Sequence, residues 1–210
     1  QPKMVYISNP TEVGTIYSKA ELTALSETCH KYGLYLFLDG ARLGYGLAAP
    51  DNDLTLPDIA ALCDVFYIGG TKVGALFGEA VVIKNPELAQ DFRYLIKQNG
   101  GMLAKGRLLG LQFDALFTDG LYQEISAHAI AMAEKLREAF TAKGYNYLAP
   151  NRTNQIFVIV PDAHLAKISE QFEYSYDQRI DAAHSCVRFC TGWATKEENV
   201  DALIRCVEKL

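Results

Sequence analysis

Two continuous apolar runs of strand length constrain the fold of this chain most strongly. They are "LYLFL" at Leu34–Leu38 and "VFYI" at Val65–Ile68. A strand that is apolar at every position, and not only at alternate positions, is typical of a sheet covered on both faces. Helical patterns separate these runs from each other and from a first short run at Met4–Ser8. This alternation predicts an α/β fold with a mostly parallel sheet.

The remaining elements are predicted from capping signals and spacing. Ser18-Lys19-Ala20-Glu21 matches a capping box that opens a helix, and Gly33 ends that helix. A second capping box at 195–198 predicts the start of the last helix. The other expected elements are helices over 57–62, 86–97, 102–117, 121–143 and 163–172, and strands over 79–83, 156–160 and 187–190.

The order of these elements predicts two domains. Strands alternate with helices in the first part, three helical segments follow, and a small α/β pattern ends the chain. We expect residues 1–120 to be part of a large domain and residues 121–210 to form a small C-terminal domain, joined through the long helix.

Composition and charge exclude several classes of protein. Half of the residues are hydrophobic and 21% are charged, which is enough apolar material for a core. The net charge of −5 without a basic run predicts no nucleic-acid partner, and no run approaches the about 18 apolar residues of a membrane span. Five cysteines without a CxxC pair predict reduced thiols in a cytoplasmic protein. A zinc site at His184, Cys186 and Cys190 is an alternative, but its spacing fits no common ligand pattern, so no metal is expected.

Charged residues follow both apolar runs. Asp39 and Arg42 follow the first run, and Lys72 follows the second. Ligands of open α/β sheets bind beyond the carboxyl ends of the strands, so Asp39 and Lys72 would share one crevice if their strands are neighbours. The simpler alternatives are a lysine that reaches water and an exposed ion pair of little energetic value.

A cofactor would explain a lysine in small, apolar company. Such a lysine can form a Schiff base with a carbonyl group, and pyridoxal 5'-phosphate carries the aldehyde most often used. This cofactor withdraws electrons when its ring nitrogen is protonated, and a nearby carboxylate stabilises that form. Lys72 is therefore the candidate for the Schiff base and Asp39 for the ring nitrogen. Gly69, Gly70 and Gly74 would let the backbone approach a flat ring.

Two segments also carry a resemblance to a known family. "LYLFLDGARLG" together with "YIGGTKVGALFGEAVVI" resembles the low-specificity threonine aldolases and the aromatic amino-acid β-eliminating lyases, which are fold-type-I pyridoxal-phosphate enzymes. The similarity continues through "VYISNPTEVGTIYSKAEL", "NGGMLAKGRLLGLQF" and "VRFCTGWATKEENVDAL". The resemblance implies the fold of these transferase-like enzymes for essentially the whole chain.

The resemblance also implies roles for the matching residues. Lys72 matches the Schiff-base lysine, and Asp39 matches the carboxylate on the pyridine nitrogen. Arg42 matches an arginine near the cofactor and the substrate carboxylate. Arg188 matches the arginine that binds the substrate α-carboxylate, because a guanidinium fork can hold a carboxylate through two hydrogen bonds. An exposed strand arginine is the alternative for Arg188.

Five further candidates rest on weaker grounds. Thr71 stands beside the lysine and is a candidate cofactor contact. Lys105 and Arg107 could reach the phosphate, of this subunit or of a neighbour, or they could be solvated. Asn9 and Thr11 follow the first strand and could touch the ring or the substrate, or they could form turn hydrogen bonds.

The activity implied is retro-aldol cleavage of a β-hydroxy-α-amino acid, such as threonine or allo-threonine, to glycine and an aldehyde, in a cytoplasmic dimer or tetramer. Alternatives are a β-eliminating lyase or an aminotransferase on the same scaffold, and an inactive fragment or scaffold domain. Many aldolases of this family carry Asn-Thr-His where this chain has Pro10-Thr11-Glu12, which leaves the substrate open. The family's fold also needs part of its large domain before this chain begins. The chain is therefore expected to be the C-terminal portion of a longer enzyme and inactive, or nearly so, on its own.

Overall fold

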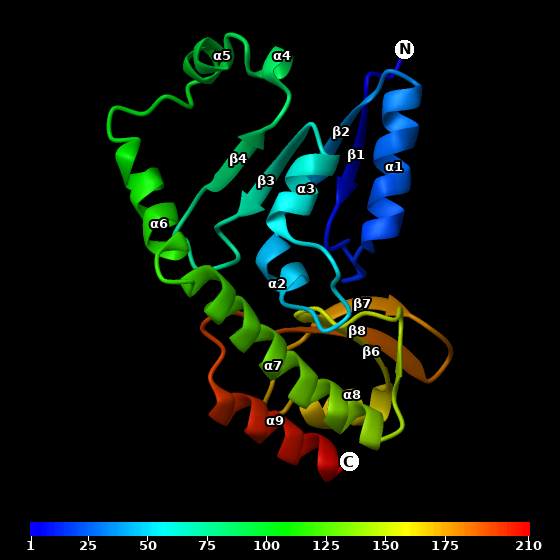
Figure 1. Ribbon diagram of the computed structural model, residues 1–210. Coiled ribbons are helices and arrows are strands. Elements are labelled where there is room, and N and C mark those ends of the chain that lie inside the picture. Colours follow the sequence, from blue (N-terminus) through cyan, green and yellow to red (C-terminus); the bar gives the residue numbers. More distant parts are fainter.

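The computed structural model describes residues 1–210 and contains two four-stranded sheets (Figure 1). The first sheet has the order β1-β2-β3-β4. Its strands are β1 (Met4–Ser8), β2 (Tyr35–Asp39), β3 (Val65–Gly69) and β4 (Glu79–Ile83). The pairs β1–β2 and β2–β3 are parallel, and β4 is antiparallel to β3. The predicted mostly parallel sheet is confirmed, and β2 and β3 are neighbours.

Three helices accompany this sheet: α1 (Lys19–Lys31), α2 (Leu43–Leu47) and α3 (Leu56–Leu62). The predicted capping box of α1 is present, because the Ser18 side chain accepts from the Glu21 N–H and the Glu21 carboxylate accepts from the Ser18 N–H. Thr55 and Asp58 form a second, unpredicted capping box at the start of α3. Reciprocal bonds of this kind satisfy backbone N–H groups that have no partner within the helix.

One face of the first sheet is more deeply buried than the other. Leu36 and Leu38 of β2 are fully buried, as are side chains of α1 and α3 that share their core. On the opposite face, Phe37 is half-buried and Tyr6 is 54% exposed. The predicted cover of both faces is therefore incomplete within this chain.

The segment after β4 also differs from the prediction. A single helix was expected over 86–97, but two short helices are found, α4 (Pro86–Ala89) and α5 (Phe92–Gln98). The break falls at Asp91, whose φ of 55° lies in the left-handed region and cannot continue a right-handed helix. Helix α6 (Arg107–Phe117) begins five residues later than expected.

Helix α7 (Leu121–Ala142) connects the two parts of the structure (Figure 1). Its first half contributes Tyr122 and Ile130 to the apolar core under the first sheet. Its second half contributes Leu136 and Phe140 to a separate core under the second sheet. A single rigid helix therefore holds both cores.

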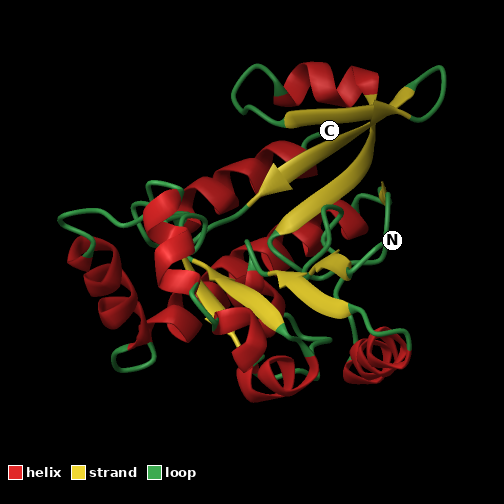
Figure 2. Ribbon diagram, turned by 90° about the horizontal axis from the view of Figure 1, so that it is seen from above, coloured by secondary structure: helices red, strands yellow, loops and turns green.

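The second sheet is antiparallel and has the order β5-β6-β8-β7. Its strands are β5 (Asn146–Tyr147), β6 (Gln155–Pro161), β7 (Ser175–Arg179) and β8 (His184–Cys190), and its further helices are α8 (Asp162–Ile168) and α9 (Glu197–Glu208). The strands of the two sheets form separate groups in Figure 2. The capping box predicted at 195–198 is wrong, because the Thr195 hydroxyl accepts from the Gly192 N–H at 2.8 Å instead. No helix combines the length and the apolar character that a membrane crossing requires.

Candidate functional site

The carboxyl ends of β2 and β3 bring Asp39 and Lys72 together. Asp39 is the last residue of β2, and Lys72 lies in the turn that follows β3. These two strands are parallel neighbours, so their carboxyl ends meet at one edge of the sheet, which faces α7 and the second sheet (Figure 1). The positive charge of Lys72 acts on the Asp39 carboxyl. Asp39 and Lys72 therefore lie at the same end of the sheet, as predicted.

The surroundings of Asp39 keep its carboxyl ionised. The Tyr6 hydroxyl donates a hydrogen bond to it, and so does the Ala41 N–H at 2.9 Å. The Tyr67 hydroxyl lowers the pKa of this carboxyl as well. Desolvation by burial raises the pKa of this carboxyl, but the hydrogen bonds and the charge of Lys72 outweigh that effect, and the pKa lies below its ordinary value.

Tyr6 is a site residue that sequence reasoning missed. It is paired in register with Phe37 of β2, and the two rings stack with centroids 5.2 Å apart. Asp39 stands two residues after Phe37 and shares its face of the sheet. Period-two alternation could have found this contact once β1 was placed beside β2. The hydrogen bond to Asp39 raises the pKa of the Tyr6 hydroxyl.

The backbone around Lys72 is fixed, whereas its side chain is exposed. The Tyr45 hydroxyl donates to the Lys72 carbonyl at 2.5 Å and accepts from the Trp193 N–H at 3.3 Å. Thr71 is exposed as well, and its hydroxyl donates a long bond of 3.4 Å to the Gly78 carbonyl. The expected apolar pocket around Lys72 is therefore wrong here, because no segment of this chain covers that turn. Its amine is accessible to a ligand.

The three glycines expected near the ring are required by the chain itself. A Cβ at Gly69 would lie 2.2 Å from the Ala41 carbonyl oxygen, and a Cβ at Gly70 would lie 2.5 Å from that of Gly78. Gly74 has a φ of 99°, which side chains rarely allow. Gly69 and Gly70 let the chain pack closely against its own backbone, and Gly74 adopts a backbone conformation that glycine allows. Their approach to a flat ring stays a prediction.

We predict that Gly69→Ala destabilises the protein by about 1–3 kcal/mol, since the added methyl group must displace backbone. Gly110→Ala is the matched control, because nothing lies within 4 Å of a Cβ at Gly110 in helix α6. That control should stabilise the helix by up to about 1 kcal/mol. Urea unfolding of both variants measures the difference. Equal midpoints for the two variants would contradict this account of Gly69.

The two predicted arginines come from different parts of the structure, Arg42 from the start of α2 and Arg188 from the second sheet. Arg42 is 17% exposed and forms a 4.0 Å ion pair with the carboxylate of Glu12. Arg188 lies on β8 of the second sheet. Burial raises the pKa of the Cys190 thiol, and the positive charges of Arg188 and Arg42 both oppose this shift. Both guanidinium charges therefore act on one thiol. A shared carboxylate ligand stays a prediction.

Arg188 is held by neutral groups. Its Nη1 donates to the Gln155 amide oxygen at 3.2 Å, and its Nη2 donates to the Ser175 hydroxyl at 3.5 Å. Its Nε is buried and has no partner. A cavity of about 360 Å³ beside it is lined by Arg188, Cys190 and residues of α9. The guanidinium group thus has only neutral hydrogen-bond partners within this chain.

Asn9 and Thr11 are engaged within their own loop. The Asn9 side-chain oxygen accepts from the Tyr17 N–H at 3.2 Å. The Thr11 hydroxyl accepts from the Thr15 N–H at 3.1 Å and shares a hydrogen bond with the Thr15 hydroxyl at 2.6 Å. These are the turn hydrogen bonds of the simpler alternative, and a contact with ring or substrate stays a prediction.

Lys105 and Arg107 are not brought together with Asp39 and Lys72. Both are exposed at the start of α6, beyond β4 in Figure 1. Their contact with a phosphate group stays a prediction.

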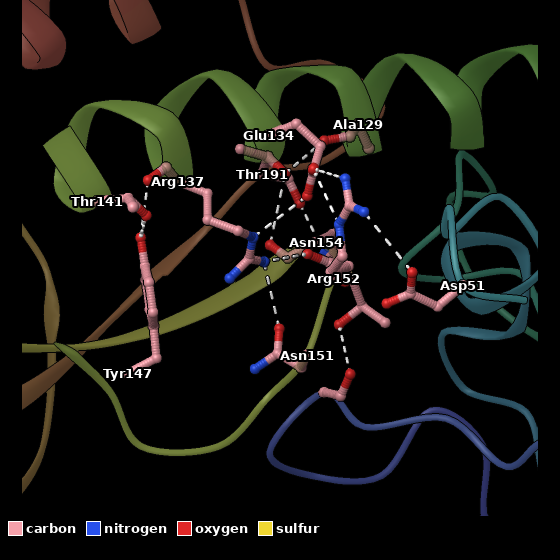
Figure 3. Close-up of polar contacts among 12 residues, drawn as sticks. Asp51, Ala129, Glu134, Arg137, Thr141, Tyr147, Asn151, Arg152, Asn154 and Thr191 are labelled. Atoms are coloured by element: carbon pink, nitrogen blue, oxygen red, sulfur yellow. Dashed lines mark hydrogen bonds and ion pairs between the residues drawn. The ribbon is translucent and has the colours of Figure 1, made fainter.

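A charged cluster fixes the second sheet against the first (Figure 3). Glu134 of α7 binds Arg137 at 3.2 Å and also forms an ion pair with Arg152. Arg152 reaches Asp51 at 3.6 Å, and Arg137 donates to the Asn151 side chain at 3.3 Å. This cluster holds the loop before β6 in place, and that loop leads directly to the residues around Arg188.

The residues gathered here fit pyridoxal phosphate in part. A ring nitrogen requires an ionised carboxylate, which Asp39 provides, and a Schiff base requires an accessible primary amine, which Lys72 provides. A carboxylate ligand requires a guanidinium group that is not already paired with an anion, and Arg188 bonds only to Gln155 and Ser175. These residues include no cluster of cations that could bind the phosphate group of the cofactor.

Known proteins of one kind match this chain. The family described as β-eliminating lyase matches residues 1–163. A low-specificity L-threonine aldolase from a Pseudomonas strain is 33% identical over 207 residues, and one from Pseudomonas aeruginosa is 31% identical over 206 residues. These matches cover 97% and 98% of this chain, but only 58% and 59% of the two relatives.

A solved structure of Leishmania major threonine aldolase is similar throughout. Its TM-score is 0.96 at 45% sequence identity, and the match covers 99% of this chain and 61% of the other. The fold-type-I architecture expected from the motifs is therefore confirmed.

Proposed function

Because this chain belongs to the β-eliminating lyase family, we propose that the complete protein uses pyridoxal phosphate to cleave a β-hydroxy-α-amino acid, such as threonine or allo-threonine, to glycine and an aldehyde. The observation that carries the proposal is an ionised Asp39 beside an accessible Lys72 at the carboxyl ends of adjacent strands. The chain spans 58% and 59% of its curated relatives, so the activity is proposed for the complete protein.

Asp39 and Lys72 would hold the cofactor. The ionised Asp39 carboxylate would accept a hydrogen bond from the protonated ring nitrogen and stabilise its positive charge. Lys72 would supply the primary amine that holds the aldehyde carbon as a Schiff base. When bound, the cofactor supplies an electron sink for the electron pair that remains on the substrate Cα after its bond to Cβ breaks. The lowered pKa of Asp39 supports this division of roles, because a neutral carboxyl could not balance the ring charge.

Arg188 and Arg42 would orient the substrate. A guanidinium group that holds the α-carboxylate fixes the rotation about Cα, and so selects which bond at Cα breaks. In the proposed reaction the β-hydroxyl loses its proton, the Cα–Cβ bond breaks, and a proton is added at Cα. Threonine then gives one glycine and one acetaldehyde.

We also propose that the complete protein is a homo-oligomer. Large apolar side chains are exposed beside the Lys72 turn and on α6, among them Leu76 at 84% and Leu111 at 56%. Exposed apolar groups on adjoining segments favour a covering partner over solvent.

A second candidate function is β-elimination, which the description of the family favours. The products separate the two reactions. Incubation of the complete protein with pyridoxal phosphate and L-threonine should give glycine and acetaldehyde in equal amounts. Formation of 2-oxobutanoate and ammonia would replace the proposal by β-elimination. Absence of all four products, with the same protein lacking cofactor as the control, would favour an inactive scaffold.

A further inference from the structure

Gln155 is a fully buried polar side chain at the start of β6. Its amide oxygen accepts from Arg188 Nη1 at 3.2 Å and lies 4.0 Å from the Cys190 sulfur. Its amide nitrogen donates to the Glu12 carbonyl oxygen at 3.3 Å. One buried amide thus connects the predicted carboxylate-binding arginine to the loop after β1.

The orientation of this amide is fixed by its two partners. A guanidinium group has only donors, and a backbone carbonyl oxygen only accepts. The Gln155 oxygen must therefore face Arg188, and its nitrogen must face Glu12. A leucine or methionine could make neither bond. A glutamate could accept from Arg188, but its second oxygen would face the carbonyl oxygen of Glu12.

Gln155 is one of three residues that join the second sheet to the loop after β1. Asn151, Thr153 and Gln155 are all buried, and each donates to a backbone carbonyl within residues 12–14. The bonds run from Asn151 Nδ2 to Val13 O at 2.8 Å, from Thr153 Oγ1 to Gly14 O at 3.1 Å, and from Gln155 Nε2 to Glu12 O at 3.3 Å. Of these three, Gln155 is the one that also contacts Arg188.

Glu12 connects both predicted arginines. Its side chain forms the 4.0 Å ion pair with Arg42, and its carbonyl binds Gln155, which binds Arg188. The relative position of the two guanidinium groups therefore depends on one loop residue and one buried amide.

We propose that Gln155 is a positioning residue, which orients Arg188 for the α-carboxylate of the amino-acid ligand. This inference rests on the function proposed above. A neutral acceptor holds Nη1 and leaves the positive charge uncompensated, whereas a carboxylate at this place would compete with the ligand.

Gln155→Met removes the acceptor at similar side-chain length, and Gln155→Glu adds a competing carboxylate. Glycine and ethylamine are the probes, because both present an amine and only glycine carries a carboxylate. In the complete protein with pyridoxal phosphate, the dissociation constant for glycine should rise about tenfold in Gln155→Met and further in Gln155→Glu. The dissociation constant for ethylamine should not change. Absorbance titration measures both, and KM should rise more than kcat falls.

Thr153→Val is the matched control. It removes a similar buried hydrogen bond to the same loop but has no contact with Arg188. If Thr153→Val weakens glycine binding as much as Gln155→Met does, the effect comes from the loop and the inference is overturned. The inference would also be overturned if the ratio of the dissociation constant for glycine to that for ethylamine stayed the same as in the wild type in both Gln155 variants.

A second measurement requires neither cofactor nor activity. Phenylglyoxal modifies arginine side chains, and mass spectrometry follows the peptide that contains Arg188. Modification should be faster in Gln155→Met than in the wild type or in Thr153→Val, since Arg188 has lost a partner. Equal rates in all three proteins would contradict the inference. A wild-type protein that binds neither amine would count against the proposed function, while this rate would still report on Gln155.

Discussion

Replacing Lys72 with alanine abolishes the visible absorbance of bound pyridoxal phosphate in the complete protein and lowers kcat by several orders of magnitude. The reason is that Lys72 is the accessible amine beside the ionised Asp39, and loss of a covalent catalytic residue removes the reaction path that it opens. Absorbance spectra of wild type and variant, each with added cofactor, and glycine formation from threonine measure the two effects.

Two further variants separate the amine from the charge of Lys72. Lys72→Arg retains a positive charge near Asp39 but should lose the absorbance band. A guanidinium group stays protonated and does not form a stable Schiff base with the cofactor aldehyde. Lys84→Ala removes an exposed lysine at the opposite end of the first sheet and should retain both band and activity. A band that survives in Lys72→Ala would assign the cofactor to another residue.

Asp39→Asn should lower kcat about 10²–10³-fold, because it removes the negative charge that stabilises the protonated ring nitrogen. The variant keeps the shape of the side chain and can still bond to Tyr6, so the fold should persist. The cofactor absorbance should remain, since Lys72 is unchanged. Steady-state kinetics and spectra of the complete protein measure these results.

The pH dependence of Asp39 follows from its lowered pKa. The folded carboxyl ionises below its ordinary value of 3.8, so the residue is charged throughout the neutral range. It stabilises the fold above the ordinary pKa, and this contribution is lost as the pH falls through the lowered value. A loss of activity between pH 5 and 7 must therefore arise from another group, and it should persist in Asp39→Asn.

Asp64→Asn is the control for Asp39→Asn. Asp64 accepts from the Leu36 N–H at 2.8 Å at the other end of β2, so its loss perturbs the same sheet without touching the site. If Asp64→Asn lowers kcat as much as Asp39→Asn does, the loss in Asp39→Asn comes from a less stable fold and not from the missing charge at the ring nitrogen.

The first sheet could be predicted from the sequence because its strands are apolar and its helices carry their own start signals. Leu36, Leu38 and Phe66 are buried in one core, as the apolar runs require. Strand β7 could not be predicted, because all five residues of "SYDQR" are exposed and it is held by pairing with β8. The break at Asp91 is a change of backbone conformation, and the Thr195 hydroxyl bonds to Gly192 three residues earlier; the apolar spacing signals neither.

The approach of Asp39 to Lys72 could be predicted because parallel neighbouring strands place their carboxyl ends together. The family resemblance stated from the motifs is confirmed by the match over residues 1–163. Gln155 could not have been found in this way, since its role depends on the register of β6 with β8 and on a loop more than a hundred residues away. The roles of the individual site residues stay predictions.

The most direct test of the central claim is borohydride reduction of the complete protein with pyridoxal phosphate, followed by peptide mass spectrometry. Reduction makes the bond between lysine and cofactor permanent, so the modified residue can be read directly. We expect one pyridoxyl group, on the peptide that contains Lys72, and none in Lys72→Ala. Modification of a different lysine, or of several lysines equally, would contradict the account.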